Sequence, residues 1–146
     1  MLADLALSAM HWFLVVFALT LTGCASQASA EQLLERYLEV SDTGELSEFE
    51  YVLSGSALES AISANEVMDK LQLEQVGATR FHSFVKSSEG EYFFCLDVSQ
   101  TRLLDLYGND LTPEDRPEQL PMRMRIEEFG QAPKITEIDI RRYQSC

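Results

Sequence analysis

The densest group of side-chain oxygens in the sequence lies between residues 105 and 115. Its members are carboxylates and one amide, the ligand types that Ca²⁺ prefers: Asp105, Asn109, Asp110, Glu114 and Asp115. The spacing does not follow the EF-hand loop, in which oxygen ligands recur at alternate positions around a glycine. Gly108-Asn109-Asp110 is typical of a turn, and residues 112–117 (TPEDRP) of a rigid polar loop. We therefore expect turn chemistry here and no metal site.

The two histidines offer little further chemistry. His82 stands between Phe81 and Ser83 with no cysteine or acid at ligand spacing, and His11 lies in the apolar N-terminal segment. A lone strand histidine is more often structural than catalytic. The sequence holds no phosphate-binding glycine loop, Ser/His/Asp arrangement, zinc-ligand spacing or basic-aromatic patch, so we expect no cofactor.

The first 24 residues differ in kind from the rest. An uncharged apolar run, WFLVVFALTL, covers residues 12–21, which is short for a membrane span but suits the core of a signal peptide. The run ends in Leu21-Thr22-Gly23-Cys24, which resembles the lipobox of bacterial lipoproteins. The resemblance implies that residues 1–23 are a cleaved lipoprotein signal peptide and that the thiol of Cys24 carries a diacylglycerol. The alternative is a transmembrane anchor, which needs about 20 apolar residues and reaches them only by including Asp4 and His11.

The chain after the leader is strongly acidic. It holds 11 basic and 23 acidic residues, a net charge of −12, which repels nucleic acid and anionic lipid headgroups. Residues 31–91 carry 13 of these acids and 4 bases, so we expect the first half to form the acidic face. Residues 24–30 are small and polar apart from the lipidated cysteine, which predicts a short flexible tether ahead of a single domain over residues 31–146.

Two further cysteines, Cys95 and Cys146, lie in the predicted domain. Export would place them in an oxidising compartment, where paired thiols tend to form disulfides. We therefore expect a Cys95–Cys146 bridge that ties the C-terminal residue to a central strand. The alternative is two independent thiols, one buried and one at the frayed terminus.

The first half predicts helices. Three serines are each followed three residues later by Glu or Gln, a capping pattern: Ser29 with Gln32, Ser47 with Glu50 and Ser56 with Glu59. Apolar residues then recur at helical spacing, as in Leu33, Leu34, Tyr37 and Leu38. We expect one helix ending near Gly44, a short one near residues 49–53 and a longer one over residues 56–72.

The second half predicts strands. Aromatic and branched residues alternate in runs near residues 78–87, 91–99, 101–107, 119–128 and 134–143, with turns at residues 87–90 and 130–133. Helices followed by strands indicate an α+β fold, with the helices packed on one face of a curved antiparallel sheet.

Residues 31–146 resemble uncharacterised lipoproteins of actinobacterial type whose domains are similar to the nuclear transport factor 2-like, ketosteroid-isomerase-like cone. The resemblance is carried by residues 95–98 (CLDV), 104–113 (LDLYGNDLTP), 115–117 (DRP) and the terminal Cys146. It implies a cone-shaped sheet and an extracytoplasmic location. It implies no activity, because this architecture hosts both enzymes and binding modules.

The isomerases that share the cone use a carboxylate base with a tyrosine or acid as oxyanion donor. The acids available on predicted strands are Asp97 and Asp105, with Tyr92 and Tyr107 near them in sequence. Alternation places Asp97 on the face of Phe93 and Cys95, where it could meet a cavity or flank the disulfide in water. Acids on half-exposed strands are usually solvated, so we assign no catalytic residue.

These patterns favour a membrane-anchored, extracytoplasmic binding module for a small ligand or an envelope partner protein. An isomerase-like or hydrolytic enzyme in the mouth of the cone is the alternative. An accessory part of an envelope assembly, with the acidic first half steering a basic partner, is a third possibility.

Overall fold

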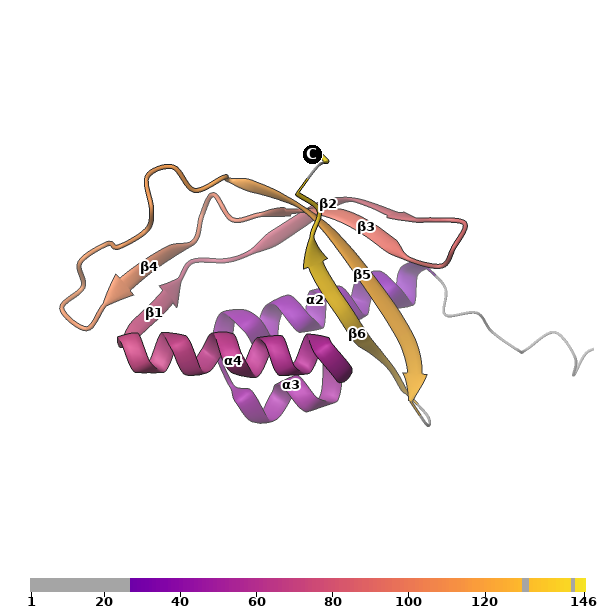
Figure 1. Cartoon of the computed structure of the whole chain (residues 1–146), viewed down its shortest axis with the longest axis horizontal. Coiled ribbons are helices and arrows are strands. Elements are labelled where there is room, and N and C mark those ends of the chain that lie inside the picture. Colours follow the sequence, from indigo (N-terminus) through magenta and orange to yellow (C-terminus); the bar gives the residue numbers. More distant parts are fainter. Residues whose placement is uncertain (1–26, 130–131, 143) are drawn as a thin grey trace, which may run out of the picture.

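The computed structural model describes residues 27–129, 132–142 and 144–146, in which three helices precede six strands (Figure 1). The helices are α2 (Gln27–Thr43), α3 (Leu46–Val52) and α4 (Gly55–Leu71). The strands are β1 (Leu73–Val76), β2 (Arg80–Lys86), β3 (Tyr92–Asp97), β4 (Arg102–Asp105), β5 (Gln119–Phe129) and β6 (Ala132–Ile140). The predicted α+β order, helices first and strands after, is confirmed.

The strands form two antiparallel sheets. The larger has the order β2-β3-β5-β6, and the smaller pairs β1 with β4. Because β1 leads into β2 and β3 leads into β4, the small sheet extends the β2–β3 hairpin into an arm at one end of the molecule (Figure 1). The short strand β1 is absent from the sequence-based prediction, which left residues 73–77 unassigned.

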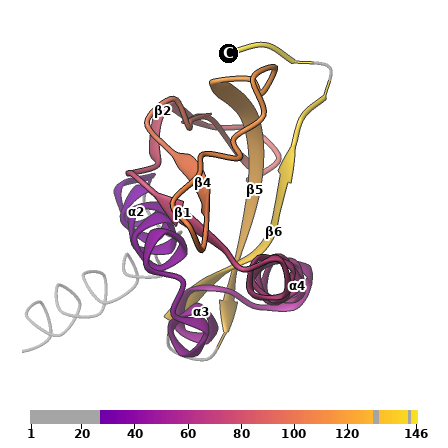
Figure 2. The same ribbon diagram turned by 90° about the vertical axis from the view of Figure 1, so that its left-hand side faces the viewer.

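The core lies between the helices and the larger sheet, and the end-on view shows the three helices grouped around one side of the strands (Figure 2). Its fully buried side chains come from every layer: Leu34, Val40, Leu53, Met124 and Ile135. Leu34 and Leu38 confirm the predicted apolar face of the first helix, and Met122 and Met124 that of the long strand. Burying a side chain of this size contributes about 1.5–3 kcal/mol.

The helices begin earlier than the serine patterns predict. Glu45 precedes α3 and Ser54 precedes α4 as N-cap residues, and neither makes a side-chain cap hydrogen bond. Ser47 and Ser56 therefore lie inside helices, and so does Ser29 in α2. The hydroxyl of Ser56 instead donates to the carbonyl oxygen of Thr136 at 3.1 Å, so a contact with β6 replaces the predicted cap.

Helix α2 also corrects the expected tether. Its described residues start at Gln27, inside the segment 24–30 predicted to be flexible, and Ala30 is buried in the core. The helix therefore already includes residues 27–30 of the predicted tether, whereas Cys24 lies outside the described residues.

The face of the large sheet that points away from the helices carries charge and the C-terminal segment. Arg123 contacts the carboxylates of Glu91 and Asp139 at 3.1 and 2.8 Å, and Arg125 contacts Glu91 at 2.9 Å. The guanidinium of Arg141 lies 5.6 Å from the centre of the Phe93 ring. Ion pairs and the C-terminal segment therefore cover this face of the sheet.

Candidate functional site: a hollow between the helices and strand β1

A solvent-open hollow of about 680 Å³ lies between α2, α3, α4 and β1. The C-terminal part of α2 and the loop after it form one wall, α4 forms the opposite wall, and β1 closes one end. Its lining combines polar and apolar residues: Tyr37, Ser41, Asp42, Thr43, Gly44, Leu46, Phe49, Ala61, Ala64, Asn65, Met68, Asp69, Leu73, Glu74 and Gln75. We call this the α2–α4 hollow.

Asp42 fixes the position of β1 against α2. Its carboxylate accepts hydrogen bonds from the side-chain amide of Gln75 at 3.1 Å, and from the backbone N–H and hydroxyl of Thr79 at 3.0 and 2.8 Å. Both carboxylate oxygens are thus occupied by neighbouring groups. Asp42 therefore builds the wall of the hollow.

The other two charged groups of the lining, Asp69 and Glu74, are exposed at the rim. Within the part of the chain that the structure describes, neither carboxylate makes a hydrogen bond or an ion pair. Asp69 lies near the end of α4 and Glu74 on β1, with Gln72 in the left-handed conformation between the two elements. The charged side chains that line the hollow are all acidic.

Tyr37 places a phenol in the wall of the hollow. Burial raises the pKa of this hydroxyl, and a hydrogen bond with Ser41 acts in the opposite direction. The net effect is upward, so the phenol stays protonated at neutral pH and can donate a hydrogen bond.

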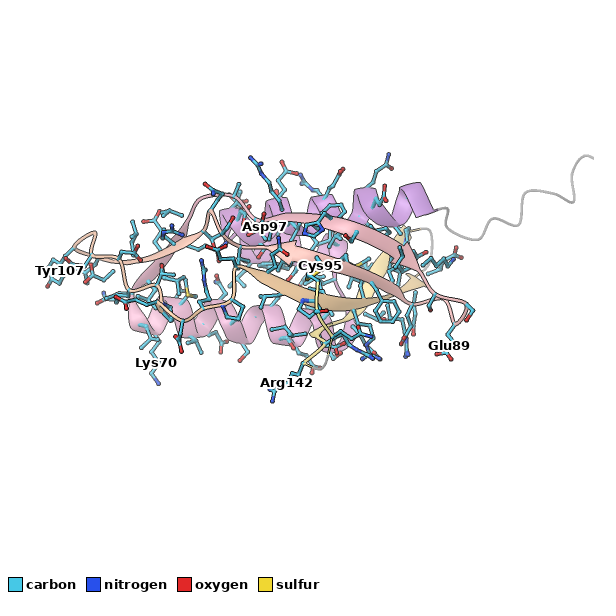
Figure 3. The ribbon with its side chains drawn as sticks, turned by 90° about the horizontal axis from the view of Figure 1, so that it is seen from above. Lys70, Glu89, Cys95, Asp97, Tyr107 and Arg142 are labelled. Carbon is cyan, nitrogen blue, oxygen red and sulfur yellow. A yellow bond between two sulfur atoms is a disulfide. The ribbon has the colours of Figure 1, made fainter. Side chains whose placement is uncertain are left out.

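The acid and tyrosine singled out on β3 do not converge. Tyr92 is buried in the core beneath the sheet, whereas Asp97 shares the opposite face with Cys95 (Figure 3). Asp97 accepts a hydrogen bond from the backbone N–H of Ser99 at 2.9 Å, and bonds with Ser99 lower its pKa. Of the two positions considered for Asp97, the structure has the one that flanks the disulfide.

The carboxylate of Asp105 stabilises a turn, as the sequence predicts. Its carboxylate accepts hydrogen bonds from the backbone N–H groups of Tyr107 and Asn109 and from the Asn109 amide, at 2.8–2.9 Å. The Asn109 side chain is the main cause of a lowered pKa at Asp105. Asp110 likewise accepts from Thr112, and no trio of His, Cys, Asp or Glu side chains among the described residues is placed to hold a metal ion.

The other residues singled out in the sequence, His82, Cys95 and Cys146, make structural contacts. His82 is exposed on β2, and its Nδ1 lies 2.9 Å from the hydroxyl of Ser83. Cys95 and Cys146 form the predicted disulfide, with Cα atoms 5.7 Å apart, and β3 lies between β2 and β5. The bridge therefore ties the end of the chain to a central strand.

Several residues of the hollow escaped the sequence analysis. Tyr37 stood only as part of a core-facing helical stripe, and Asp42 and Gln75 carried no motif. The only sequence feature that pointed to this region was the group of acids beside the apolar residue Leu46. This feature could not predict a hollow, because the lining comes from four separate elements.

No family model and no curated protein matches this sequence. A solved structure, described as the intermembrane space region of chloroplast protein ARC6, is similar with a TM-score of 0.57 and 16% sequence identity. The similarity covers 81% of this chain and 98% of that chain. At this identity it supports a shared fold and leaves the function open.

The described helices were also compared with the length and apolar character of a membrane span. None of those within residues 27–71 combines the length and the apolar character needed to cross a bilayer.

Proposed function

We propose that this chain is a lipoprotein anchored through Cys24 to the extracytoplasmic face of a cell membrane. Its domain is a nuclear transport factor 2-like cone that binds a ligand or partner protein in the α2–α4 hollow. The observation that carries the proposal is the hollow itself, which is open to solvent and combines apolar side chains with two carboxylates that have no partner among the described residues. Binding sites are usually concave, with apolar contacts and a few polar groups that fix the orientation of what binds.

The anchor is supported by the sequence Leu21-Thr22-Gly23-Cys24, which resembles a lipobox. Three residues reach at most about 11 Å, so an acylated Cys24 would hold the start of α2 close to the membrane. Each buried methylene contributes about 0.8 kcal/mol, and two or more acyl chains give durable anchoring.

Metabolic labelling with palmitate tests the anchor. We expect label in the wild-type chain and in Cys146→Ala, which retains Cys24, and none in Cys24→Ala. Equal labelling of Cys24→Ala would reject lipidation at this residue.

Site-specific photo-crosslinking in intact cells tests binding. A photoreactive residue replaces Leu46 at the hollow, which is 40% exposed, or Val85 on β2, which is 55% exposed. We expect a discrete adduct from position 46 alone. No adduct from position 46, or the same adducts from both positions, would count against binding in the hollow.

A further inference from the structure

We infer that the occupant of the α2–α4 hollow is a cationic protein segment that inserts a large apolar side chain. This inference rests on the proposed function and specifies the chemistry of the partner. It combines the composition of the lining, the charge around it and its position relative to the chain start.

Part of the lining favours an apolar group. Leu46 keeps 40% of its surface exposed and Met68 is half-buried, whereas Phe49 behind them is already buried. Covering this surface would remove apolar area from water, which stabilises a complex by about 25 cal/mol per Å² before the costs of association. A peptide without a bulky apolar side chain leaves this surface wet.

The rim selects positive charge. Asp69 and Glu74 line the hollow as exposed side chains without a cationic partner among the described residues, and no basic residue is part of the lining. A Lys or Arg placed there gains attraction without breaking an existing ion pair. Partly shielded pairs at the edge of an interface also steer association and set its specificity.

The acidic surface continues beyond the hollow. A shallower depression across α2 shares Asp42 with it and adds Glu35 and Glu39, with Arg80 as its one basic lining residue. Glu39 is paired with Arg36 at 2.7 Å, whereas the Glu35 carboxylate has no partner among the described residues. A segment that leaves the hollow along α2 therefore meets further negative charge.

The position of the hollow favours a protein segment over a membrane lipid. The hollow lies along the C-terminal part of α2 and near the arm, whereas the chain enters the fold at the opposite end of that helix (Figure 1). Sixteen residue steps of helix separate these ends by about 24 Å. A second copy of this chain is also disfavoured, because residues 24–146 carry a net charge of −12 and two copies repel each other.

Three short synthetic peptides test the inference. The first peptide has Lys and Leu at helical spacing, so that they lie on opposite faces of a helix. The second has Glu in place of Lys, and the third has Ser in place of Leu. Binding to the full chain in a non-ionic detergent is followed by the fluorescence anisotropy of a labelled peptide. We expect the Lys/Leu peptide to bind at least about tenfold more tightly than either of the others.

Two double variants separate the hollow from net charge. Asp69→Lys with Glu74→Lys reverses the rim, and Glu89→Lys with Glu128→Lys makes the same change in net charge elsewhere. Figure 3 places Lys70, the neighbour of Asp69, and Glu89 toward opposite ends of the molecule. We expect the rim variant to bind the Lys/Leu peptide roughly tenfold more weakly than the control variant. The neutral pair Asp69→Asn with Glu74→Gln should weaken binding in the same direction.

Equal affinity of the rim and control variants would overturn the inference, because binding would then follow net charge alone. Equal binding of the Glu/Leu peptide would also overturn it. If either result came with a discrete crosslink from position 46, the cationic occupant would be rejected and the binding module would stand.

Discussion

Asp42 at the end of α2 accepts hydrogen bonds from both the backbone N–H and the hydroxyl of Thr79, at 3.0 and 2.8 Å. The two residues are 37 positions apart, and their contact joins the helix to the segment between β1 and β2. Gln75 donates to the same carboxylate from β1. The wall of the α2–α4 hollow therefore depends on one acid.

Replacing Asp42 by Ala should lower the free energy of unfolding by about 1.5–3 kcal/mol, because the donors of Thr79 and Gln75 lose a charged acceptor. Thr79→Val removes only the hydroxyl and should cost about 1 kcal/mol. Urea unfolding followed by circular dichroism measures both. Asp69→Ala is the control and should stay within about 0.5 kcal/mol of wild type. A cost at Asp42 no greater than at Asp69 would contradict the role of this contact.

Gly77 lets the chain pass close to Gln100 after β1. Its φ is +90°, and an added Cβ would collide with the backbone carbonyl of Gln100. Gly108 has a similar φ of +81° with open space around it. Gly108→Ala should therefore cost about 1–2 kcal/mol from backbone strain, and Gly77→Ala clearly more. Similar unfolding midpoints for the two variants would show that the close approach is unimportant.

The Cys95–Cys146 bridge closes a loop with a sequence separation of 51. In the chain-entropy model it stabilises the fold by about 4 kcal/mol. Cys146→Ser should lower the free energy of unfolding by a similar amount, and a reductant should destabilise the wild type but leave the variant unchanged. Equal stability of the oxidised wild type and Cys146→Ser would contradict this prediction, as would two free thiols in the isolated protein.

The turn at Asp105 gives a defined pH dependence. Its hydrogen bonds lower the pKa of the carboxyl below 3.8 in the folded chain, whereas the unfolded chain protonates near that value. The stabilisation is therefore complete above pH 3.8 and is lost as the pH falls through the folded pKa. The wild type should be more stable than Asp105→Asn at pH 6, and the difference should shrink below pH 3.8. Asp115→Asn is the control, since that carboxylate has no hydrogen bond to any residue that the structure describes. A difference independent of pH would contradict the assignment.

The local periodicity of apolar residues was sufficient to predict the main helices and strands. The apolar stripe through Leu34 and Leu38 predicts the buried face of α2, and alternation through Met122 and Met124 predicts that of β5. The disulfide followed from compartment chemistry, which needs no geometry. Each of these inferences uses residues close in sequence or a property of the whole chain.

The remaining features depend on contacts between distant segments. Strand β1 has four residues and owes its conformation to pairing with β4, about thirty positions later. Ser56 lies inside α4, where its hydroxyl donates a hydrogen bond to Thr136, 80 positions away, instead of capping the helix. The hollow combines three helices and a strand, so neither its lining nor the presence of Asp69 and Glu74 in that lining could be predicted from sequence spacing.

The mass of the protein extracted from membranes shows whether Cys24 is lipidated, on which binding at the envelope depends. We predict a chain that begins at Cys24, carries a diacylglyceryl group on that residue and contains the Cys95–Cys146 disulfide. Cys24→Ala should retain residues 1–23 and carry no acyl mass. A wild-type chain that retains residues 1–23, or one with an unmodified thiol at Cys24, would exclude a lipid anchor at this residue.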